Sequence, residues 1–175
     1  MMNLIRIDPL DFNNGPGLRC VIWCAGCNHH CPECHNKEAQ DPSLGRPLGQ
    51  WAYDAIDKAL SNPHCSGVTF SGGEATFPDN REDSLVLMRY IKERHPEKTI
   101  WMWTGYLYEE ISSLPMMEYV DVCVDGPYIA AKNTGFNRLR YRGSSNQRVI
   151  NVPASRKEGK TVLFVDFDGL TSDQF

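Results

Sequence analysis

The sequence predicts an α/β fold built on a mostly parallel β-sheet. Apolar runs of strand length alternate with stretches in which apolar residues recur at helical spacing, and such alternation forms right-handed βαβ units. The chain of 175 residues is long enough for one hydrophobic core and too short for two. Complete eight-stranded (β/α) barrels usually need at least ~200 residues, so we expect an abbreviated, open (β/α) barrel.

The first half of the chain contains two predicted strands, each followed by a helix. "RCVIWC" (19–24) is dominated by β-branched and aromatic residues and follows the turn-forming "NNGPG". Apolar residues at helical spacing predict a helix over 51–60. "GVTFS" (67–71) reads as a buried strand, and we expect the next helix to be capped by Asp83 and to end before Pro96.

The second half continues this alternation. "TIWMW" (99–103) predicts a strand, "LYEEISSL" (107–114) a short helix and "YVDVCV" (119–124) a further strand. "TVLFVDF" (161–167) predicts a last strand. Residues 125–147 between them are polar and rich in Gly, Asn and Arg, so we expect a loop there.

The charge of the chain argues against a nucleic-acid partner. Its net charge is −4 and its isoelectric point is near 5.7, whereas proteins that grip nucleic-acid phosphates present basic surfaces. Four arginines are nevertheless close in sequence. They predict a solvated loop, a site for an anionic ligand, or a docking surface for an acidic partner: Arg138, Arg140, Arg142 and Arg148.

Cysteine usage indicates metal or redox chemistry in the cytoplasm. The first residues, "MMNLIRIDPL", show neither a basic leader nor an apolar run of signal-peptide length. No segment approaches the ~18 apolar residues of a membrane span, so we expect a cytoplasmic protein without a membrane partner. Thiols stay reduced in that compartment. The seven cysteines are an odd number, and four of them are crowded together, which is unlike a disulfide framework.

The crowded stretch "CAGCNHHCPECHN" (24–36) leaves two metal sites open. Its four cysteines form two C-x2-C pairs, which suits a tetrahedral zinc ion. Zinc ribbons, however, usually separate their pairs by about fifteen or more residues. The alternative unit is Cys27, Cys31 and Cys34 in the spacing C-x3-C-x2-C. This unit supplies three thiolates to a 4Fe-4S cluster and leaves one iron open.

Further unusual residues follow the other predicted strands. "SGGE" (71–74) follows the second strand, "WTGY" (103–106) the third and "VDGPY" (124–128) the fourth. Two glycines allow the backbone to approach a ligand closely, and the carboxylate of Glu74 can accept a charge-assisted hydrogen bond from an ammonium group. Taken alone, "GGE" also fits a tight turn. Because loops at the carboxyl ends of parallel strands converge, we expect all four loops to form one site.

These motifs together resemble the radical S-adenosylmethionine enzymes, whose signature is C-x3-C-x2-C followed by GGE after the next strand. Longer stretches are similar to the glycyl-radical activating enzymes of anaerobic ribonucleoside-triphosphate reductase. The resemblance covers about residues 5–152 of a single domain spanning 1–175, and residues 153–175 stay unassigned. It rests on these stretches: "NGPGLRCVIWCAGCNHHCPECHN", "FSGGE", "IWMWTGY", "DVCVDGPY" and "RGSSNQRVIN".

The resemblance implies two cofactors. Cys27, Cys31 and Cys34 would bind one 4Fe-4S cluster per chain, and the amine and carboxylate of S-adenosylmethionine would chelate its fourth iron. The loop with Glu33, Cys34 and His35 would pass beneath the adenine. Its contacts would be mainly through the backbone, since Glu33 stands where related activators often carry an aromatic residue.

The methionyl group of S-adenosylmethionine would be held at the next loops. By resemblance, Gly72, Gly73 and Glu74 would bind its amino group. Thr104 and Asp125 stand at the ends of the third and fourth strands, and we expect them near its carboxylate. Asp125 would act through a bound cation, because a bare aspartate would repel that carboxylate.

Not every cysteine or histidine of the loop is expected to bind metal. Cys20, Ile22 and Cys24 share one face of an alternating strand, so Cys24 is predicted to be a buried hydrophobe and not a ligand. Once three thiolates are present, no imidazole is needed. Supporting or solvent-exposed roles are therefore expected for His29, His30 and His35.

The implied activity is that of an oxidoreductase. One electron from a reducing protein would cleave S-adenosylmethionine, and the 5′-deoxyadenosyl radical would take a hydrogen atom from a glycine of the large reductase subunit. The stretch from Arg138 to Arg148 would then be the docking surface for the reductase. Such chemistry belongs to the cofactors, so no catalytic acid or base is expected among the side chains. Two alternatives stay open, namely an activator of another glycyl-radical enzyme and a non-catalytic zinc-binding module.

Overall fold

A single seven-stranded sheet organises the molecule. The computed structural model describes residues 1–133, 135 and 140–174, and its strands lie in the order β3-β1-β2-β4-β5-β6-β7. The strands are β1 (Asn3–Asp11), β2 (Leu18–Cys24), β3 (Arg46–Pro47), β4 (Cys65–Gly72), β5 (Thr99–Trp103), β6 (Val122–Asp125) and β7 (Arg148–Asn151). The helices are α1 (Gln50–Leu60), α2 (Arg81–Arg94), α3 (Tyr108–Ile111) and α5 (Val152–Glu158).

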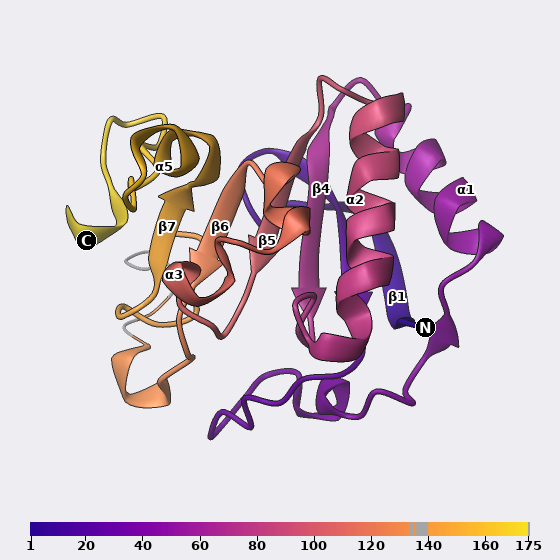
Figure 1. The fold of residues 1–175 in the computed structure, drawn as a ribbon, viewed down its shortest axis with the longest axis horizontal. Helices are drawn as coiled ribbons and strands as arrows, with labels where there is room; N and C mark the ends of the chain where they lie inside the picture. Colours follow the sequence, from indigo (N-terminus) through magenta and orange to yellow (C-terminus); the bar gives the residue numbers. More distant parts are fainter. Residues whose placement is uncertain (134, 136–139, 175) are drawn as a thin grey trace.

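The four central strands run parallel, as the alternation predicted. β2, β4, β5 and β6 pair in parallel, and helices connect β4 to β5 and β5 to β6. β1 pairs antiparallel with β2 and with β3, and β7 pairs antiparallel with β6. In Figure 1, β4 points downward and β7 upward. The α/β fold with a mostly parallel sheet is therefore confirmed, and the sheet is not closed into a barrel.

The two long helices form where apolar periodicity predicted them, with one shifted boundary. α1 buries Ala52, Ile56, Ala59 and Leu60 against the sheet. α2 begins at Arg81 after Asn80, so the prediction that Asp83 caps this helix is wrong. Asp83 lies in the first turn, where its negative charge still interacts favourably with the helix dipole.

Other segments differ from the sequence prediction. The strand predicted over 161–167 is wrong, because Leu163 makes only an isolated bridge with Ile150. The strand predicted over 119–124 starts later, at Val122. Besides the two-residue strand β3, three longer elements were not predicted. They are the strands β1 and β7 and the helix α5, which is capped by Asn151 and carries Pro at its start.

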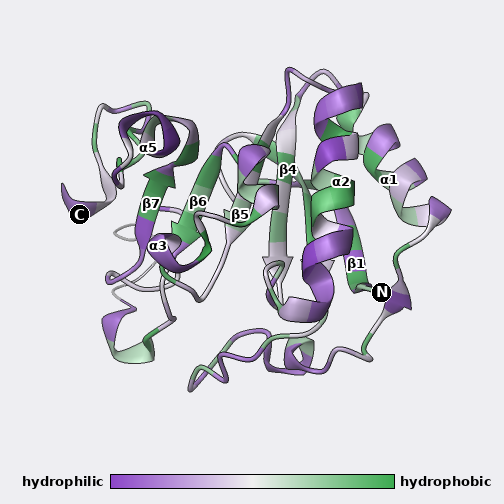
Figure 2. Cartoon of the chain, in the orientation of Figure 1, coloured by the Kyte–Doolittle hydropathy of each residue, from purple (hydrophilic) through white to green (hydrophobic). Residues whose placement is uncertain are grey.

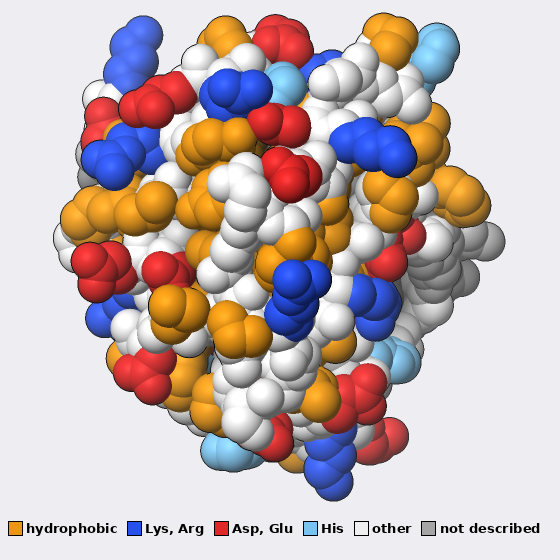
Figure 3. Space-filling view, turned by 90° about the vertical axis from the view of Figure 1, so that its right-hand side faces the viewer, with side chains coloured by type: hydrophobic (Ala, Val, Ile, Leu, Met, Phe, Trp, Pro, Cys, Tyr) orange, Lys and Arg blue, Asp and Glu red, His pale blue; other side chains and the backbone are white. Residues whose placement is uncertain are grey.

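The sheet has apolar side chains on both faces. Ile100 and Met102 of β5 point into the main core with α1, α2 and α3, while Trp101 and Trp103 point to the opposite face. Hydrophobic colouring is concentrated along the sheet strands and on stripes of the helices in Figure 2. On the side of α1 and β1, hydrophobic, acidic and basic side chains are interspersed (Figure 3). Within the described part of the chain, no helix combines the length and apolarity needed to cross a bilayer.

Candidate functional site

The loops after β2, β4, β5 and β6 meet around one open pocket, as their position at the carboxyl ends predicted. Its cavity volume is about 190 Å³, and the pocket opens to solvent. Residues 143 and 147, which precede β7, close a further side. The lining includes Cys27, His29, Cys31, Cys34, His35, Gly72, Gly73, Glu74, Trp103, Thr104, Gly105, Gly126, Tyr128, Gly143 and Gln147.

The four crowded cysteines have two different environments. Cys27, Cys31 and Cys34 are half-buried free thiols that border the pocket. Cys24 is fully buried in the main core with Cys20. Burial raises the pKa of the Cys24 thiol to about 12 and that of Cys27 to about 11, the latter opposed by a hydrogen bond from the backbone N–H of His29.

The cysteine loop folds back on itself over a short distance. Cys34 N donates to Cys31 O (3.2 Å), which brings two of the pocket thiols into one turn. His30 and Glu33 adopt positive φ values of 48° and 57°. Residues other than glycine rarely adopt this conformation, and functional loops often contain it.

The glycine pair joins the second loop to the first. Gly73 N donates to Cys24 O (2.7 Å), and Glu74 N donates to Gly26 O (2.8 Å). A Cβ atom on Gly73 would lie 2.6 Å from Gly26 O, so no larger residue fits without a shift. The buried Asn80 reinforces this junction through a hydrogen bond from Nδ2 to Glu74 O (3.0 Å). The two motifs singled out in the sequence thus form one unit.

The carboxylate of Glu74 lies at the centre of the site and is 1% exposed. Thr76 donates to Oε1 from its backbone N (3.0 Å) and from Oγ1 (2.6 Å). Three donors surround Oε2, namely Thr104 Oγ1 (3.0 Å), Gly105 N (2.9 Å) and His29 Nε2 (3.0 Å). Thr104 therefore lies next to Glu74 and borders the pocket.

Asp125, by contrast, is turned away from this pocket. Its buried carboxylate accepts a hydrogen bond from Tyr108 N (2.7 Å) and is paired with Arg148, whose Nε lies 3.0 Å from Oδ1. Asp125 is absent from the pocket lining, whereas the next residue, Gly126, belongs to it. Its predicted position near a ligand carboxylate stays a prediction, which these partners do not favour.

The predicted arginine surface is largely engaged within the chain. Arg138 lies outside the described residues. Arg140 pairs with Asp166 and, at 2.6 Å, with Asp168 of the C-terminal segment. Arg142 is buried and donates to the carbonyl oxygens of Ser145 and Gln147. Arg148 pairs with Asp125 and with Glu109 at 2.7 Å.

Of the residues predicted beneath the adenine, His35 borders the pocket and Glu33 does not, and Tyr128 is a pocket residue that was not predicted individually. The His35 ring lies 5.7 Å from that of Tyr128, while Glu33 is exposed. The His29 ring contacts Tyr106 edge-on at 4.4 Å. Tyr106 and Tyr128 close the "WTGY" and "VDGPY" motifs, so those motifs marked the right loops. Within the described residues, no three His, Cys, Asp or Glu side chains are arranged to hold a single metal ion.

Comparisons with known proteins show the family of the chain. Residues 13–150 match the family of the 4Fe-4S single cluster domain. A relative from Enterobacteria phage T4 is 42% identical over 148 residues, which cover 85% of this chain and 93% of the relative. Relatives from Escherichia coli K12 (36% over 155 residues, 86% and 99% covered) and Vibrio cholerae (36% over 150 residues, 83% and 96%) are also similar. All three relatives carry the name anaerobic ribonucleoside-triphosphate reductase-activating protein.

Proposed function

The chain belongs to the family of anaerobic ribonucleoside-triphosphate reductase-activating proteins, and from this premise we propose that it is a radical S-adenosylmethionine enzyme. Its target is a glycine of the large reductase subunit, which becomes a glycyl radical. A reducing protein supplies the electron. The open sheet is the partial barrel of such enzymes, residues 1–175 act as one domain, and the reaction takes place in the cytoplasm.

The division of the four cysteines carries this proposal. Cys27, Cys31 and Cys34 border one pocket, whereas Cys24 belongs to the core. Three thiolates suit a 4Fe-4S cluster with one iron left for another ligand. Four converging thiolates would suit a closed zinc site instead. The match to a single-cluster 4Fe-4S domain supports the same conclusion.

The chain contributes binding and orientation. Cys27, Cys31 and Cys34 would hold the cluster, which would supply one electron for cleavage of the bond from sulfur to the 5′ carbon of S-adenosylmethionine, so that the adenosyl carbon could take a hydrogen atom from the glycine. Gly72 and Gly73 let the backbone approach the methionyl group, and the carboxylate of Glu74 accepts a hydrogen bond from its amino group. Thr104 orients the Glu74 carboxylate through the 3.0 Å hydrogen bond from its Oγ1 to Oε2.

Other residues of the site hold the nucleoside and admit the partner. His35 and Tyr128 face the pocket beside the cysteine loop, where the adenine binds in this proposal. Hydrogen-atom transfer requires no general base, so none of these side chains has to move a proton. The unclosed sheet lets a glycine-bearing loop of the reductase reach the adenosyl carbon.

One experiment tests the proposal directly. The protein is purified without oxygen, reconstituted with iron and sulfide, reduced and studied by EPR. We expect a 4Fe-4S signal that changes on addition of S-adenosylmethionine, and a glycyl-radical signal when the reductase is present. Tightly bound zinc without an iron–sulfur signal would instead establish the zinc-binding module. Cluster and cleavage without a radical on the reductase would point to another glycyl-radical partner.

A further inference from the structure

The carboxylate that would accept a hydrogen bond from the methionyl amino group already has five donors. Glu74 Oε1 accepts two hydrogen bonds from Thr76, and Oε2 accepts three, from His29, Thr104 and Gly105. A carboxylate offers about four lone-pair sites. The amino group of the ligand would be a sixth donor, so it can bind Glu74 at the present number of hydrogen bonds only by replacing one of the five.

His29 is the donor that can leave at the lowest cost. The backbone donors at Thr76 and Gly105 are fixed by the chain, and the Thr76 and Thr104 side chains are buried. The His29 side chain is 16% exposed and borders the pocket. Since a carboxylate only accepts, Nε2 of His29 carries the hydrogen in this contact.

The imidazole also fills space inside the site. A Cβ atom on Gly105 would lie 2.4 Å from Cδ2 of His29, so the ring packs directly against the backbone that follows β5. The Tyr106 ring also contacts the His29 ring edge-on, with 4.4 Å between the ring centroids. Tyr106 itself is anchored to Asn28, the neighbour of His29, by hydrogen bonds of 2.8 and 3.1 Å. The ring thus occupies a defined position beside Glu74.

We propose that His29 is a place-holder for the amino group of the ligand. In the unloaded site its Nε2–H is one of the five donors to the buried Glu74 carboxylate, and on binding an N–H of the ligand's amino group takes that position while the imidazole turns out. His29 is then a positioning residue that protects the carboxylate and sets the affinity for ligands carrying an amino group. This inference rests on the proposed function, because it takes S-adenosylmethionine as the ligand.

The test compares two ligands on the anaerobically reconstituted protein by equilibrium dialysis. The ligands are S-adenosylmethionine and its analogue in which hydrogen replaces the amino group. His29→Ala removes the competing donor, so we expect about tenfold tighter binding of S-adenosylmethionine, the size of one hydrogen bond to a charged acceptor. Binding of the analogue should change by less than about twofold. His29→Gln keeps an N–H donor and should lie between His29→Ala and wild type.

Two controls separate displacement from general damage. His30→Asn alters the exposed neighbouring histidine, and Asn tolerates its positive φ of 48°; both affinities should equal those of wild type. In the Glu74→Gln background the charged acceptor is gone, so His29→Ala should no longer tighten binding. In the cluster-free protein without ligand, His29→Ala should lower the melting temperature, because the fold loses the hydrogen bond to Glu74 and the packing of the ring against Gly105.

Each other outcome overturns the inference. Unchanged affinity for S-adenosylmethionine in His29→Ala would mean that the imidazole does not have to move. Weaker binding of both ligands would mean that His29 contacts the ligand or supports the loop. These results leave the proposed function standing, since wild type still binds S-adenosylmethionine. Failure of wild type to bind iron and S-adenosylmethionine would instead reject the proposed function, and this inference with it.

Discussion

Cys24 and Cys27 are three residues apart, yet they belong to different parts of the molecule. Cys24 ends β2 and its side chain packs in the main core. Ala25 and Gly26 then turn the chain, with Gly26 at a φ of 92° and its N–H bonded to Ala39 O (2.8 Å). After this turn Cys27 faces the pocket. A two-residue turn therefore decides which thiol is a hydrophobe and which is available to a metal.

The first prediction follows from this difference. Cys24→Ala should retain a full complement of iron and cleavage of S-adenosylmethionine, and it should lose only ~1–2 kcal/mol of stability from reduced packing. The same substitution at Cys27, Cys31 or Cys34 should abolish both cluster and cleavage. Iron content and EPR beside wild type provide the measurement. Loss of the cluster in Cys24→Ala would contradict the three-cysteine ligand set.

At the scale of elements, α3 and β7 are joined by charges across the sheet edge. Arg148 of β7 binds both Asp125 of β6 and Glu109 of α3, and these hydrogen bonds raise its pKa. Hydrogen bonds from Arg148 and then Thr161 lower the pKa of Glu109 to about 2. The C-terminal part of the chain is thus fastened to the parallel strands partly by ion pairs.

The second prediction is a pH dependence of this junction. A carboxyl group whose pKa is lowered from 4.5 to about 2 on folding contributes stability above about pH 4.5, and that contribution is lost as the pH falls towards 2. Because Glu109 is 54% exposed, solvent screening limits its contribution to ~0.5–1 kcal/mol.

Urea unfolding at several pH values tests it. Glu109→Gln should be less stable than wild type at pH 7, and the two curves should converge between pH 4.5 and about 2. The exposed Glu118 provides the matched control, since Glu118→Gln should follow wild type throughout. A constant difference between Glu109→Gln and wild type over the whole range would show that packing and not charge is lost.

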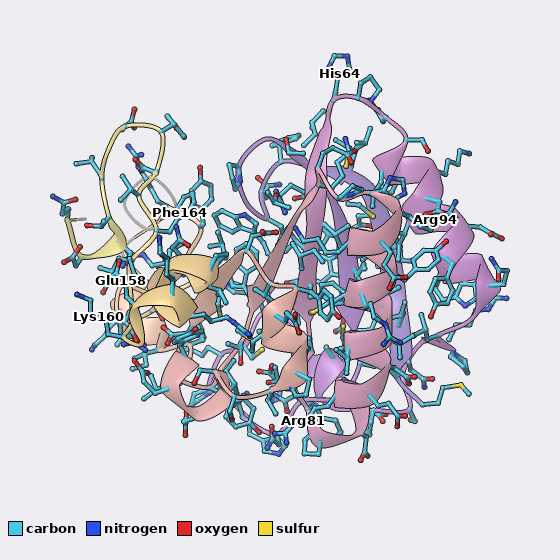
Figure 4. The ribbon with its side chains drawn as sticks, turned by 45° about the horizontal axis from the view of Figure 1, so that its top comes forward. His64, Arg81, Arg94, Glu158, Lys160 and Phe164 are labelled. Atoms are coloured by element: carbon cyan, nitrogen blue, oxygen red, sulfur yellow. The ribbon has the colours of Figure 1, made fainter. Side chains whose placement is uncertain are left out.

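The C-terminal segment forms a cover for the second face of the sheet. Phe164 packs edge-on against Trp101 at 5.3 Å, and Tyr141 contacts the same indole at 5.2 Å. Phe164 N also donates to Val149 O (2.8 Å). Figure 4 shows Phe164 on this segment, beyond the helix that ends near Glu158. Phe164, which lies in the part of the chain left unassigned from the sequence, therefore adds to the smaller hydrophobic cluster.

The third prediction concerns this cover. Phe164→Ala should cost ~1–3 kcal/mol, less than the ~3–5 kcal/mol of a fully buried phenylalanine because the side chain is only half-buried. It should also shift the tryptophan fluorescence, because Trp101 becomes more exposed to solvent. Phe167→Ala is the control, since Phe167 is 81% exposed. Equal stability of both variants in urea would mean that the segment lies on the sheet without stabilising it.

For the whole molecule, the site and the main core are built from different residues. The core between the sheet and α1 and α2 contains Ile22, Phe70, Leu87, Met88 and Ile100. The three pocket thiols are absent from that core and lie on a single loop. Burial of these apolar side chains therefore stabilises the fold without a contribution from a bound metal.

The fourth prediction is that the protein stays folded without its cluster. Chelation of the iron should preserve the far-UV circular dichroism and a cooperative urea transition, while proteolytic cleavage and amide exchange increase in the loop of residues 27–36. Small zinc domains behave in the opposite way, since they unfold without metal. Loss of cooperative unfolding on chelation would show that the cluster holds the sheet together.

Some of this architecture follows from the sequence by itself. The parallel strands β2, β4, β5 and β6 and the helices α1 and α2 are encoded by local apolar patterns. Because loops after parallel strands converge on one edge, the order of elements also predicted that the cysteine, "SGGE" and "WTGY" loops would border one pocket. Local pattern further predicted that Cys24 is buried. These features depend on neighbours within a few residues, which the sequence displays.

The tertiary structure alone decided the remaining features. Residues 161–167 could form a strand only by pairing along an edge strand of the sheet. They make a single bridge there, between Leu163 and Ile150, and Phe164 packs against Trp101 instead. Asp125 is paired with Arg148, 23 residues away. Glu74 accepts from His29, 45 residues away. The hydrogen-bond partners of Asp125 and Glu74 are set by the packing of segments far apart in the sequence. The prediction of a strand over 161–167 was wrong because strand propensity measures only how well a residue fits a half-buried surface. Local sequence therefore predicts where the site is, and only the folded chain determines which groups inside it are already bonded.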